Sequence, residues 1–246
     1  MRFTGERLVP GFSWLENMIE EELARLSLVG DYIPRSVALD VGCGTGHATN
    51  YLAKYGSVLA VGVDISPEAI NFARSYYSHP TLRFAPMDSL ALAFPDNMFD
   101  LVCSLDVIEH IQNPDKYLAE IVRVLKAGGK YFLTTPNKRF TSLQGDPSWE
   151  FHVHEFFLEE LRDTLGGHFS SIEIYGAQIT AYDQHPIRKL TNSRLSAIKH
   201  ILPAKIRVGF SSRLRHLIKP HVDPEDIKLS TENLDNSKVF LAICQP

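Results

Sequence analysis

Five short apolar runs alternate with helix-forming segments over residues 36–137, and this alternation restricts the fold more than any other feature of the sequence. The runs are rich in β-branched residues and apolar at successive positions, as is typical of parallel strands that helices cover on both faces of a sheet. Strands that alternate with helices indicate a doubly wound α/β fold. The predicted strands cover residues 36–42, 57–64, 81–88, 99–106 and 130–137.

The segments around these strands predict helices. The clearest covers residues 114–126, because Asn113 is a suitable N-cap and Pro114 fits the first helical position. Gly128–Gly129 is expected to end this helix. Further helices are predicted at 45–55, at 66–78 and at 12–28, the last within an N-terminal helical cap over residues 1–35.

The C-terminal part adds two predicted strands, at 170–180 and 237–245, after a helix over 155–167. The whole chain, residues 1–246, is therefore expected to form one domain around a mostly parallel, seven-stranded sheet. The alternation does not explain residues 181–236, and so long a segment favours an inserted functional element over a loop. We predict a helical insertion between the last two strands.

The insertion carries a basic stretch, Arg188 to Lys219, in which nine Lys and Arg residues alternate with apolar ones and no acid occurs. We interpret it first as a lid whose apolar face covers an active site. A second hypothesis is that residues 188–219 make peripheral contact with a membrane surface, or meet an anionic or lipid-linked acceptor.

The composition is that of an ordinary globular protein, with 44% hydrophobic residues, 22% charged residues and a formal net charge of −4. This charge gives no overall reason to expect nucleic acid as a partner. No secretory signal or membrane-spanning run is visible, so a cytoplasmic location is expected. Cys43, Cys103 and Cys244 are far apart and are predicted to be buried free thiols.

A glycine-rich loop follows the first predicted strand in the segment "VALDVGCGTG". Its glycines, Gly42, Gly44 and Gly46, come directly after an apolar run that ends in Asp40. Such a loop lets the backbone approach a ligand closely at the sheet edge where α/β proteins bind their ligands. Asp64 ends the second strand, where an acid can accept hydrogen bonds from both hydroxyls of a ribose. Loop and acid together indicate an adenosine-type ligand.

Two adenosine-containing cofactors compete for this loop. The NAD fingerprint is G-x-G-x-x-G, with the pyrophosphate at a helix N-terminus. Here the spacing is G-x-G-x-G, and the Asp40 carboxylate would repel a pyrophosphate. A carboxylate suits a ligand with a cationic amino group, which favours S-adenosylmethionine (SAM).

The motifs also resemble those of a known family. "LDVGCGTG", "VGVDIS", "MDSL" and "FDLVCSLDVIEHI" are similar to the first four motifs of the class I SAM-dependent methyltransferases. The ubiquinone/menaquinone-biosynthesis type and the methyltransferases encoded with glycan-assembly genes are the most similar, the latter also through "FTGERLVPG". The resemblance implies a Rossmann-like fold, methyltransferase activity and SAM as cofactor.

The resemblance further implies roles for individual residues. Asp40 and the three glycines of the loop would hold the methionine moiety, chiefly its amino group. Asp64 would bind the ribose, with Ile65 beside the adenine. The remaining residues are Asp88 at the adenine amino group, Ser89 close by, and Ser104 and Leu105 in the wall near the sulfonium.

The acceptor remains open at this point. We expect methyl transfer to a small molecule or glycan, most readily at oxygen. The alternatives are C-methylation of a prenylated quinone-type ring and a catalytically silent SAM-binding partner subunit. Methylation of nucleic-acid bases is disfavoured, because "SLDV" stands where those enzymes carry an "NPPY"-type motif.

Two segments offer a catalytic base for a hydroxyl acceptor. "LDVIEH" places Asp106, Glu109 and His110 after the fourth strand, and "EFHVHEF" carries His152 and His154. We predict His152 or His110 as the base, with a structural role as the alternative for each. No metal is expected, because the H-x-H pair has no evident third ligand beyond Glu150 and Glu155.

Overall fold

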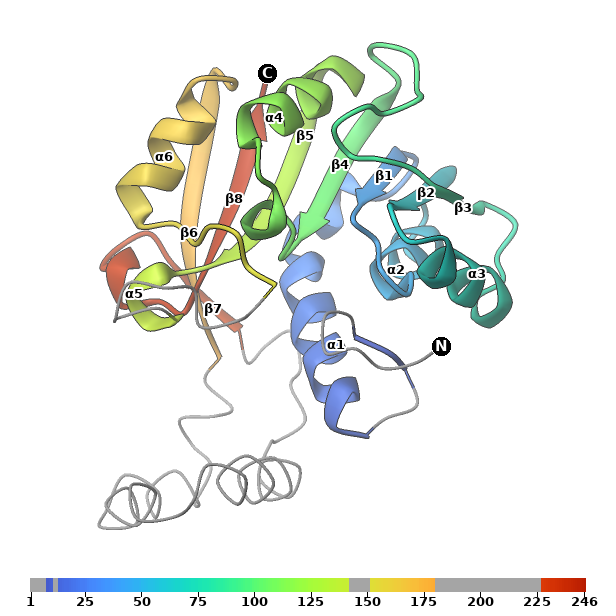
Figure 1. Ribbon diagram of the computed structural model, residues 1–246, viewed down its shortest axis with the longest axis horizontal. Coiled ribbons are helices and arrows are strands. Elements are labelled where there is room, and N and C mark those ends of the chain that lie inside the picture. The colour runs from blue at the N-terminus through green and yellow to red at the C-terminus, as the bar shows by residue number, and fades with distance from the viewer. Residues whose placement is uncertain (1–7, 11–12, 142–150, 180–226) are drawn as a thin grey trace.

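The computed structural model describes residues 8–10, 13–141, 151–179 and 227–246. They form an eight-stranded sheet with the strand order β3-β2-β1-β4-β5-β8-β6-β7 (Figure 1). Strands β1 to β5 pair in parallel, and β8 pairs antiparallel with both β5 and β6. The strands are β1 Val37–Val41, β2 Leu59–Asp64, β3 Leu82–Pro86, β4 Phe99–Leu105, β5 Leu125–Pro136, β6 Ser171–Ile179, β7 Ile227–Ser230 and β8 Val239–Gln245.

Strand order reverses at β1, which pairs with β2 on one side and with β4 on the other. In open α/β sheets ligands bind beyond the carboxyl ends of the strands at such a switch point. The register places Asp40 of β1 between Gly62 of β2 and Cys103 of β4. The topology therefore brings the predicted glycine loop to the expected binding edge.

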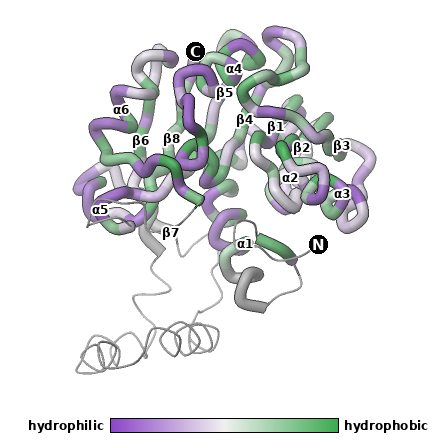
Figure 2. The backbone as a smooth tube through the Cα atoms, viewed as in Figure 1, coloured by the Kyte–Doolittle hydropathy of each residue, from purple (hydrophilic) through white to green (hydrophobic). Residues whose placement is uncertain are grey.

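Helices cover both faces of the sheet (Figure 1). Helices α1, α2 and α3, with the 3-10 helix η1, pack on one face around Leu26, Leu52 and Ile70, whereas α4 and α6 pack on the other. Figure 2 shows the hydrophobic residues concentrated on the central strands. The bounds are α1 Ser13–Leu26, η1 Ser27–Tyr32, α2 His47–Lys54, α3 Pro67–Tyr76, η2 Ile108–His110, α4 Pro114–Val124, α5 Lys138–Thr141, α6 Leu158–Gly166 and η5 Leu234–Asn236.

The predicted start of α4 is confirmed and its predicted end is wrong. The Asn113 side chain accepts a hydrogen bond from the Lys116 amide, and Pro114 is the first helical residue. The helix stops at Val124 rather than at Gly128–Gly129, because Leu125 already pairs with Phe99 on β4. The two glycines instead belong to an irregular stretch inside β5, where Gly128 has a φ of 81°.

The described sheet has one strand more than the seven predicted. Strand β7 pairs with β6 and lies within the segment 181–236, which the sequence predicted to be a helical insertion. The 3-10 helix η5 follows it, so residues 227–236 form a strand and a turn. The remainder of that prediction, including the basic stretch 188–219, lies outside the described residues.

Cys43, Cys103 and Cys244 are buried free thiols, as predicted. Among the residues that the structure describes, no helix combines the length and the apolar character needed to cross a bilayer.

Candidate active site

The glycine loop between β1 and α2 requires glycine for steric reasons. Gly42, Gly44 and Gly46 have φ angles of 74°, 51° and 89°, in the left-handed region that side chains disfavour. A Cβ atom on Gly42 would lie 2.7 Å from the Val107 side chain, and one on Gly46 would lie 2.7 Å from the Phe84 ring. The loop is therefore tightly folded and closely packed at the switch point.

Asp40 is a buried carboxyl group at the end of β1, with 1% of its surface exposed. The Thr49 hydroxyl donates a hydrogen bond of 2.6 Å to its Oδ2 atom. Burial raises the pKa of Asp40 to about 6, although this hydrogen bond and the charge of His47 act in the opposite direction. A cationic ligand group beside Asp40 would favour its charged form.

Asp64 ties the end of β2 to the glycine loop. Its Oδ2 atom accepts a hydrogen bond of 2.9 Å from the Gly44 amide, and its Oδ1 atom accepts one of 2.8 Å from Ser66. Ile65, the next residue, is 69% exposed although it is a large apolar side chain. The structure thus places a carboxylate and an exposed apolar side chain together at the binding edge.

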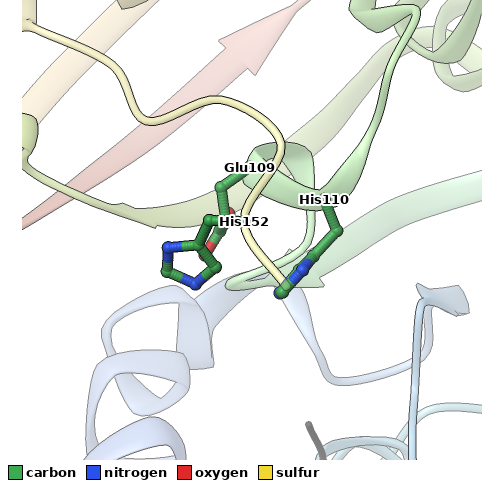
Figure 3. Close-up of side chains that lie close together, drawn as sticks. All are labelled: Glu109, His110 and His152. Atoms are coloured by element: carbon green, nitrogen blue, oxygen red, sulfur yellow. The ribbon is translucent and has the colours of Figure 1, made fainter. Parts of the chain in front are cut away.

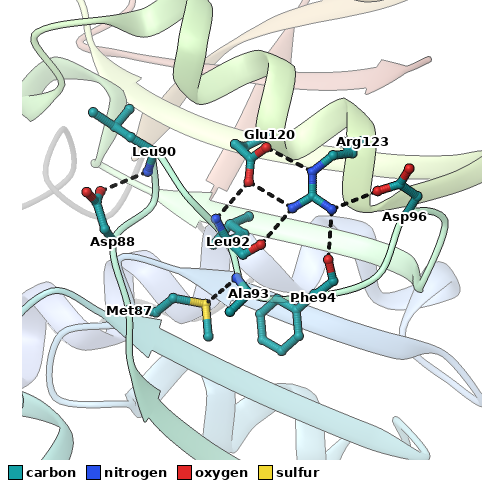
Figure 4. Close-up of polar contacts among 9 residues, drawn as sticks. All are labelled: Met87, Asp88, Leu90, Leu92, Ala93, Phe94, Asp96, Glu120 and Arg123. Carbon is teal, nitrogen blue, oxygen red and sulfur yellow. Dashed lines mark hydrogen bonds and ion pairs between the residues drawn. The ribbon is translucent and has the colours of Figure 1, made fainter.

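Asp88 lies in the loop that follows β3, which the Arg123 side chain of α4 holds in place (Figure 4). The Asp88 side chain accepts a hydrogen bond from Leu90, and Ser89 is half-buried beside it. The Arg123 guanidinium donates to the carbonyls of Leu92 and Phe94 and pairs with two carboxylates, Glu120 and Asp96. The loop is therefore shaped by contacts within the protein.

The two predicted wall residues at the end of β4 differ in exposure. The Ser104 side chain is fully buried, and its hydroxyl lies 2.7 Å from the hydroxyl of Tyr131. The role of Ser104 in the wall near the sulfonium stays a prediction. Leu105 is also buried, although 9% of its surface is exposed.

Helix α1 is fixed over this edge of the sheet by two ion pairs. Arg25 contacts Asp106 at 2.8 Å, and Glu22 lies 2.6 Å from Nε2 of His47, the first residue of α2. Burial disfavours a charged His47, but Glu22 outweighs it, so the pKa of His47 lies above its ordinary value. Asp106 has a φ of 53° and also accepts a hydrogen bond from Thr134.

The two segments that carry the predicted bases are joined by three hydrogen bonds. The amides of Val153 and His154 both donate to the backbone carbonyl of Glu109, at 2.8 and 3.0 Å. The His110 Nδ1 atom lies 2.8 Å from the carbonyl oxygen of Phe151, which can only accept. Residues separated by more than forty positions thus form one surface after β4.

The rings of His110 and His152 meet edge to face, with centroids 4.9 Å apart. Nδ1 of His152 lies 2.6 Å from Oε1 of Glu155, a fully buried carboxylate that also accepts from Thr141. In both histidines Nδ1 therefore carries the proton toward an oxygen, which leaves the lone pair on Nε2. A histidine oriented in this way by a carboxylate has the arrangement of a general base.

Glu109 is fully buried beside these histidines. Its Oε2 atom accepts a hydrogen bond of 3.0 Å from Thr135, and its Oε1 atom has no hydrogen-bond partner. Burial, and after it the charge of Asp106, holds the pKa of Glu109 well above its usual range. One donor atom each of Glu109, His110 and His152 lies within 4.8 Å of the others.

Sequence reasoning missed three residues that shape this site. Glu22 and Arg25 were visible only as charges on an amphipathic helix, and nothing in the sequence indicates which distant residues they contact. Arg123 follows Glu120 at a spacing that predicts a pair within a helix. Its reach to the loop after β3 depends on tertiary packing.

Residues 39–133 match the family described as "Methyltransferase domain". Similar curated proteins include a mitochondrial ubiquinone biosynthesis O-methyltransferase of Dictyostelium discoideum. It is 34% identical over 42% of this chain and 36% of its own length. A 2-methyl-6-phytyl-1,4-hydroquinone methyltransferase of Synechocystis is 32% identical over 60% of this chain and 46% of its own length.

A phosphoethanolamine N-methyltransferase of Caenorhabditis elegans is 30% identical over 58% of this chain. This chain spans 34% of that relative and less than half of each of the other two. The names of these relatives give an oxygen acceptor, a hydroquinone and a nitrogen acceptor. They therefore agree on methyl transfer and differ in the acceptor.

Solved structures share the fold. An S-adenosylmethionine-dependent methyltransferase from Mesorhizobium loti has a TM-score of 0.57 at 15% identity, covering 92% of this chain and all of the other. The [4+2]-cyclase SpnF has a TM-score of 0.57 at 22% identity, covering 91% of this chain and 81% of the other. Residues 39–133 therefore resemble a methyltransferase domain in sequence, and the sheet order agrees with the fold shared with these solved structures.

Proposed function

We propose that this protein transfers the methyl group of SAM to a hydroxyl oxygen of a small molecule or glycan. The observation that carries the proposal is the pairing of the glycine loop with Asp64, joined by the hydrogen bond from the Gly44 amide. This pairing lies where α/β sheets bind nucleotides. The proposed contacts are those stated above, from Asp40 at the amino group to Asp88 at the adenine.

The reaction is an in-line displacement at the methyl carbon. The bond from the sulfonium to the methyl group breaks, and its electron pair stays on sulfur, which becomes the neutral thioether of S-adenosylhomocysteine. The acceptor oxygen forms the new bond to carbon and loses its proton. Positioning supplies much of the acceleration in such reactions, up to about 7–11 kcal/mol.

The proton of the acceptor hydroxyl is the reason for proposing roles for His152 and His110. A sugar hydroxyl ionises less readily than a phenol, so it profits more from a nearby base. We assign the principal role to His152, because Glu155 fixes its ring and directs the lone pair on Nε2 away from that carboxylate. His110 has only a backbone carbonyl in the corresponding place.

The proposal is tested with SAM labelled in its methyl group and a panel of phenols, sugars, prenylated quinols and amines. Label in an O-methyl product, lost in the Asp64→Ala variant, is the expected result. Label on a quinol ring carbon would favour the alternative of C-methylation, to which the Synechocystis relative gives support.

A second candidate function is SAM binding without methyl transfer. It is favoured by the likeness to a cyclase, which shows that this fold also occurs in proteins named for other chemistry. Calorimetry that detects SAM binding while no acceptor in the panel gains label would support this candidate and count against the first.

An anionic or lipid-linked acceptor, with membrane contact through residues 188–219, remains part of the proposal on the basis of sequence alone. Sedimentation with vesicles that contain anionic lipid tests it. Failure of the full chain to bind them at low salt would contradict membrane contact. We also propose a cytoplasmic location, which fractionation of cells that express the protein would test.

A further inference from the structure

We propose that Glu109, His110 and His152 bind one divalent transition-metal ion at the acceptor end of the site. Figure 3 shows the three side chains together, two from the turn after β4 and one from the segment before α6. The binding proposal stands on its own geometry, and the role given to the ion rests on the methyltransferase function proposed above.

The three residues have the separation of a metal-binding set. One possible ligand atom of each lies within 4.8 Å of the other two. The sequence suggested no third ligand near the H-x-H pair, because Glu109 is more than forty positions away. The backbone hydrogen bonds from Val153 and His154 to the Glu109 carbonyl bring it there.

The hydrogen-bond partners of the two histidine rings fit metal binding. The Nδ1 atoms of His110 and His152 face the Phe151 carbonyl and the Glu155 carboxylate, at 2.8 and 2.6 Å. Metal-binding histidines nearly always donate their other ring N–H to a carboxylate or a backbone carbonyl. This contact fixes the tautomer that presents the Nε2 lone pair to an ion.

The buried carboxyl group of Glu109 provides an independent observation. Its Oε1 atom is buried and has no hydrogen-bond partner. A buried oxygen without a partner is costly, by about 1–3 kcal/mol in mutational data. Asp106 is not an equivalent ligand, because its two oxygens already accept from Arg25 and Thr134. A cation between Glu109 and the histidines would satisfy the unpaired oxygen.

The donor set selects the class of ion. Two imidazoles and one carboxylate suit Zn²⁺, Co²⁺ or Fe²⁺, whereas Mg²⁺ and Ca²⁺ prefer oxygen ligands. Three protein ligands leave a coordination position open, as in catalytic zinc sites. In that position the ion would act as a Lewis acid on the acceptor hydroxyl and ease loss of its proton to solvent. In the metal-bound protein His152 is then a ligand, and the ion replaces it as the group that eases loss of the proton.

The experiment uses the full chain without an affinity tag, freed of metal by a chelator and then titrated with Zn²⁺ in a calorimeter. Co²⁺ serves as a second probe, because its visible absorption reports coordination by nitrogen and oxygen. We expect one ion per chain. Loss of a group that only hydrogen-bonds a metal-binding side chain costs about 10–100-fold in metal affinity. Glu109→Gln and His152→Ala should therefore weaken binding by at least about 100-fold.

His154→Ala is the matched control. His154 is the other member of the H-x-H pair, but its ring pairs with Glu160, and it is not part of the three-residue set. We expect this variant to bind Zn²⁺ like the unaltered protein. Equal affinity in all variants, absence of Zn²⁺ binding, or tighter binding of Mg²⁺ than of Zn²⁺ would each overturn the proposal.

SAM binding is measured on the same samples. Glu109→Gln should bind SAM with unchanged affinity, which shows that the fold and cofactor site are intact. A protein that binds SAM and turns over an acceptor but binds no Zn²⁺ refutes only the metal site. A protein that binds Zn²⁺ but not SAM refutes the proposed function and leaves the metal site in place.

Discussion

The two ends of the active site are built in different ways. At the cofactor end, the part predicted to hold the methionine and ribose moieties is one continuous segment, residues 37–66, in which Asp64 contacts Gly44 and Ser66, and Asp40 contacts Thr49. The acceptor end joins α1, the turn after β4 and the segment before α6. Its contacts link residues 81 positions apart, in Arg25 and Asp106, and 41 positions apart, in His110 and Phe151.

This difference indicates which end is free to vary. The cofactor end fails if one glycine gains a side chain, because its spacing is fixed within a single loop. The acceptor end is held by several contacts between segments, and these can change one at a time. The relatives described above carry names that differ in the acceptor, as expected if the acceptor end is the one that varies.

The largest expected effect is at the cofactor end. Asp64→Ala removes the predicted acceptor for two ribose hydroxyls and the contacts to Gly44 and Ser66. At about 1.5–3 kcal/mol for each hydrogen bond to a charged group, SAM affinity should fall by about 10²–10⁴-fold, measured by calorimetry. Circular dichroism controls for folding. A folded variant with unchanged affinity would disprove the ribose assignment.

The next largest expected effect is a loss of turnover at the acceptor end, with no change in SAM affinity at the cofactor end. His152→Ala should lower turnover by about 100-fold, at the low end of the range for general acid–base residues, because His110 lies beside it. SAM affinity should not change. His154→Ala, whose ring pairs with Glu160, should leave turnover within twofold. Equal turnover in both variants would return His152 to a structural role.

The free energy of unfolding of glycine-to-alanine variants tests whether the packing of the loop excludes a side chain. Gly46→Ala combines a positive φ with a Cβ atom 2.7 Å from Phe84, so the free energy of unfolding should fall by about 2–5 kcal/mol. Gly128→Ala is the matched control, with a similar φ but nothing within 4 Å of the added atom. It should lose only about 1–2 kcal/mol in urea unfolding. Equal losses would contradict the packing argument.

The smallest effect is a pH dependence at Asp40. Because its pKa is about 6 and the ammonium group of SAM needs the carboxylate form, affinity should rise roughly tenfold between pH 5 and 7. His47, Glu22 and Asp64 also act on this charge. In the absence of SAM, the contribution of Asp40 to the free energy of unfolding changes with pH in the opposite direction. The folded pKa is raised above the ordinary 3.8, so this contribution to stability is full below about pH 4 and lost as pH rises through 6.

Asp40→Asn is the variant for this measurement. It should bind SAM more weakly at pH 7 and show a flat profile between pH 5 and 7. A variant profile with the same slope as that of the unaltered protein would assign the titration to another group.

Much of the fold and the cofactor end could be predicted from the sequence, because their signals are local. The cap at Asn113, the glycine spacing and the acid at the end of β2 each lie within one short segment. The end of α4 could not be predicted, because pairing of Leu125 with Phe99 overrides the glycine signal. The strand β7 was missed because it is only four residues long at the sheet edge.

The acceptor end was predicted only as a set of candidate residues. The sequence names Glu109, His110 and His152, but their proximity depends on a loop that packs across the sheet edge. Likewise, Ser104 stands in an apolar strand with buried neighbours, and only the packing shows that its hydroxyl lies near that of Tyr131. Side-chain partners far apart in the chain leave no periodic trace in a single sequence.

The place of β8 in the sheet affects how the protein is completed during translation. β8 follows β5 and β6 in the chain but lies between them, paired with both. Until residues 239–245 leave the ribosome, strands β1 to β5 of a nascent chain can already be paired while the other edge of β5 has no partner strand. Such an edge is prone to pair with other chains. Chaperone binding to ribosome-bound intermediates should therefore concentrate there, and end when β8 is released.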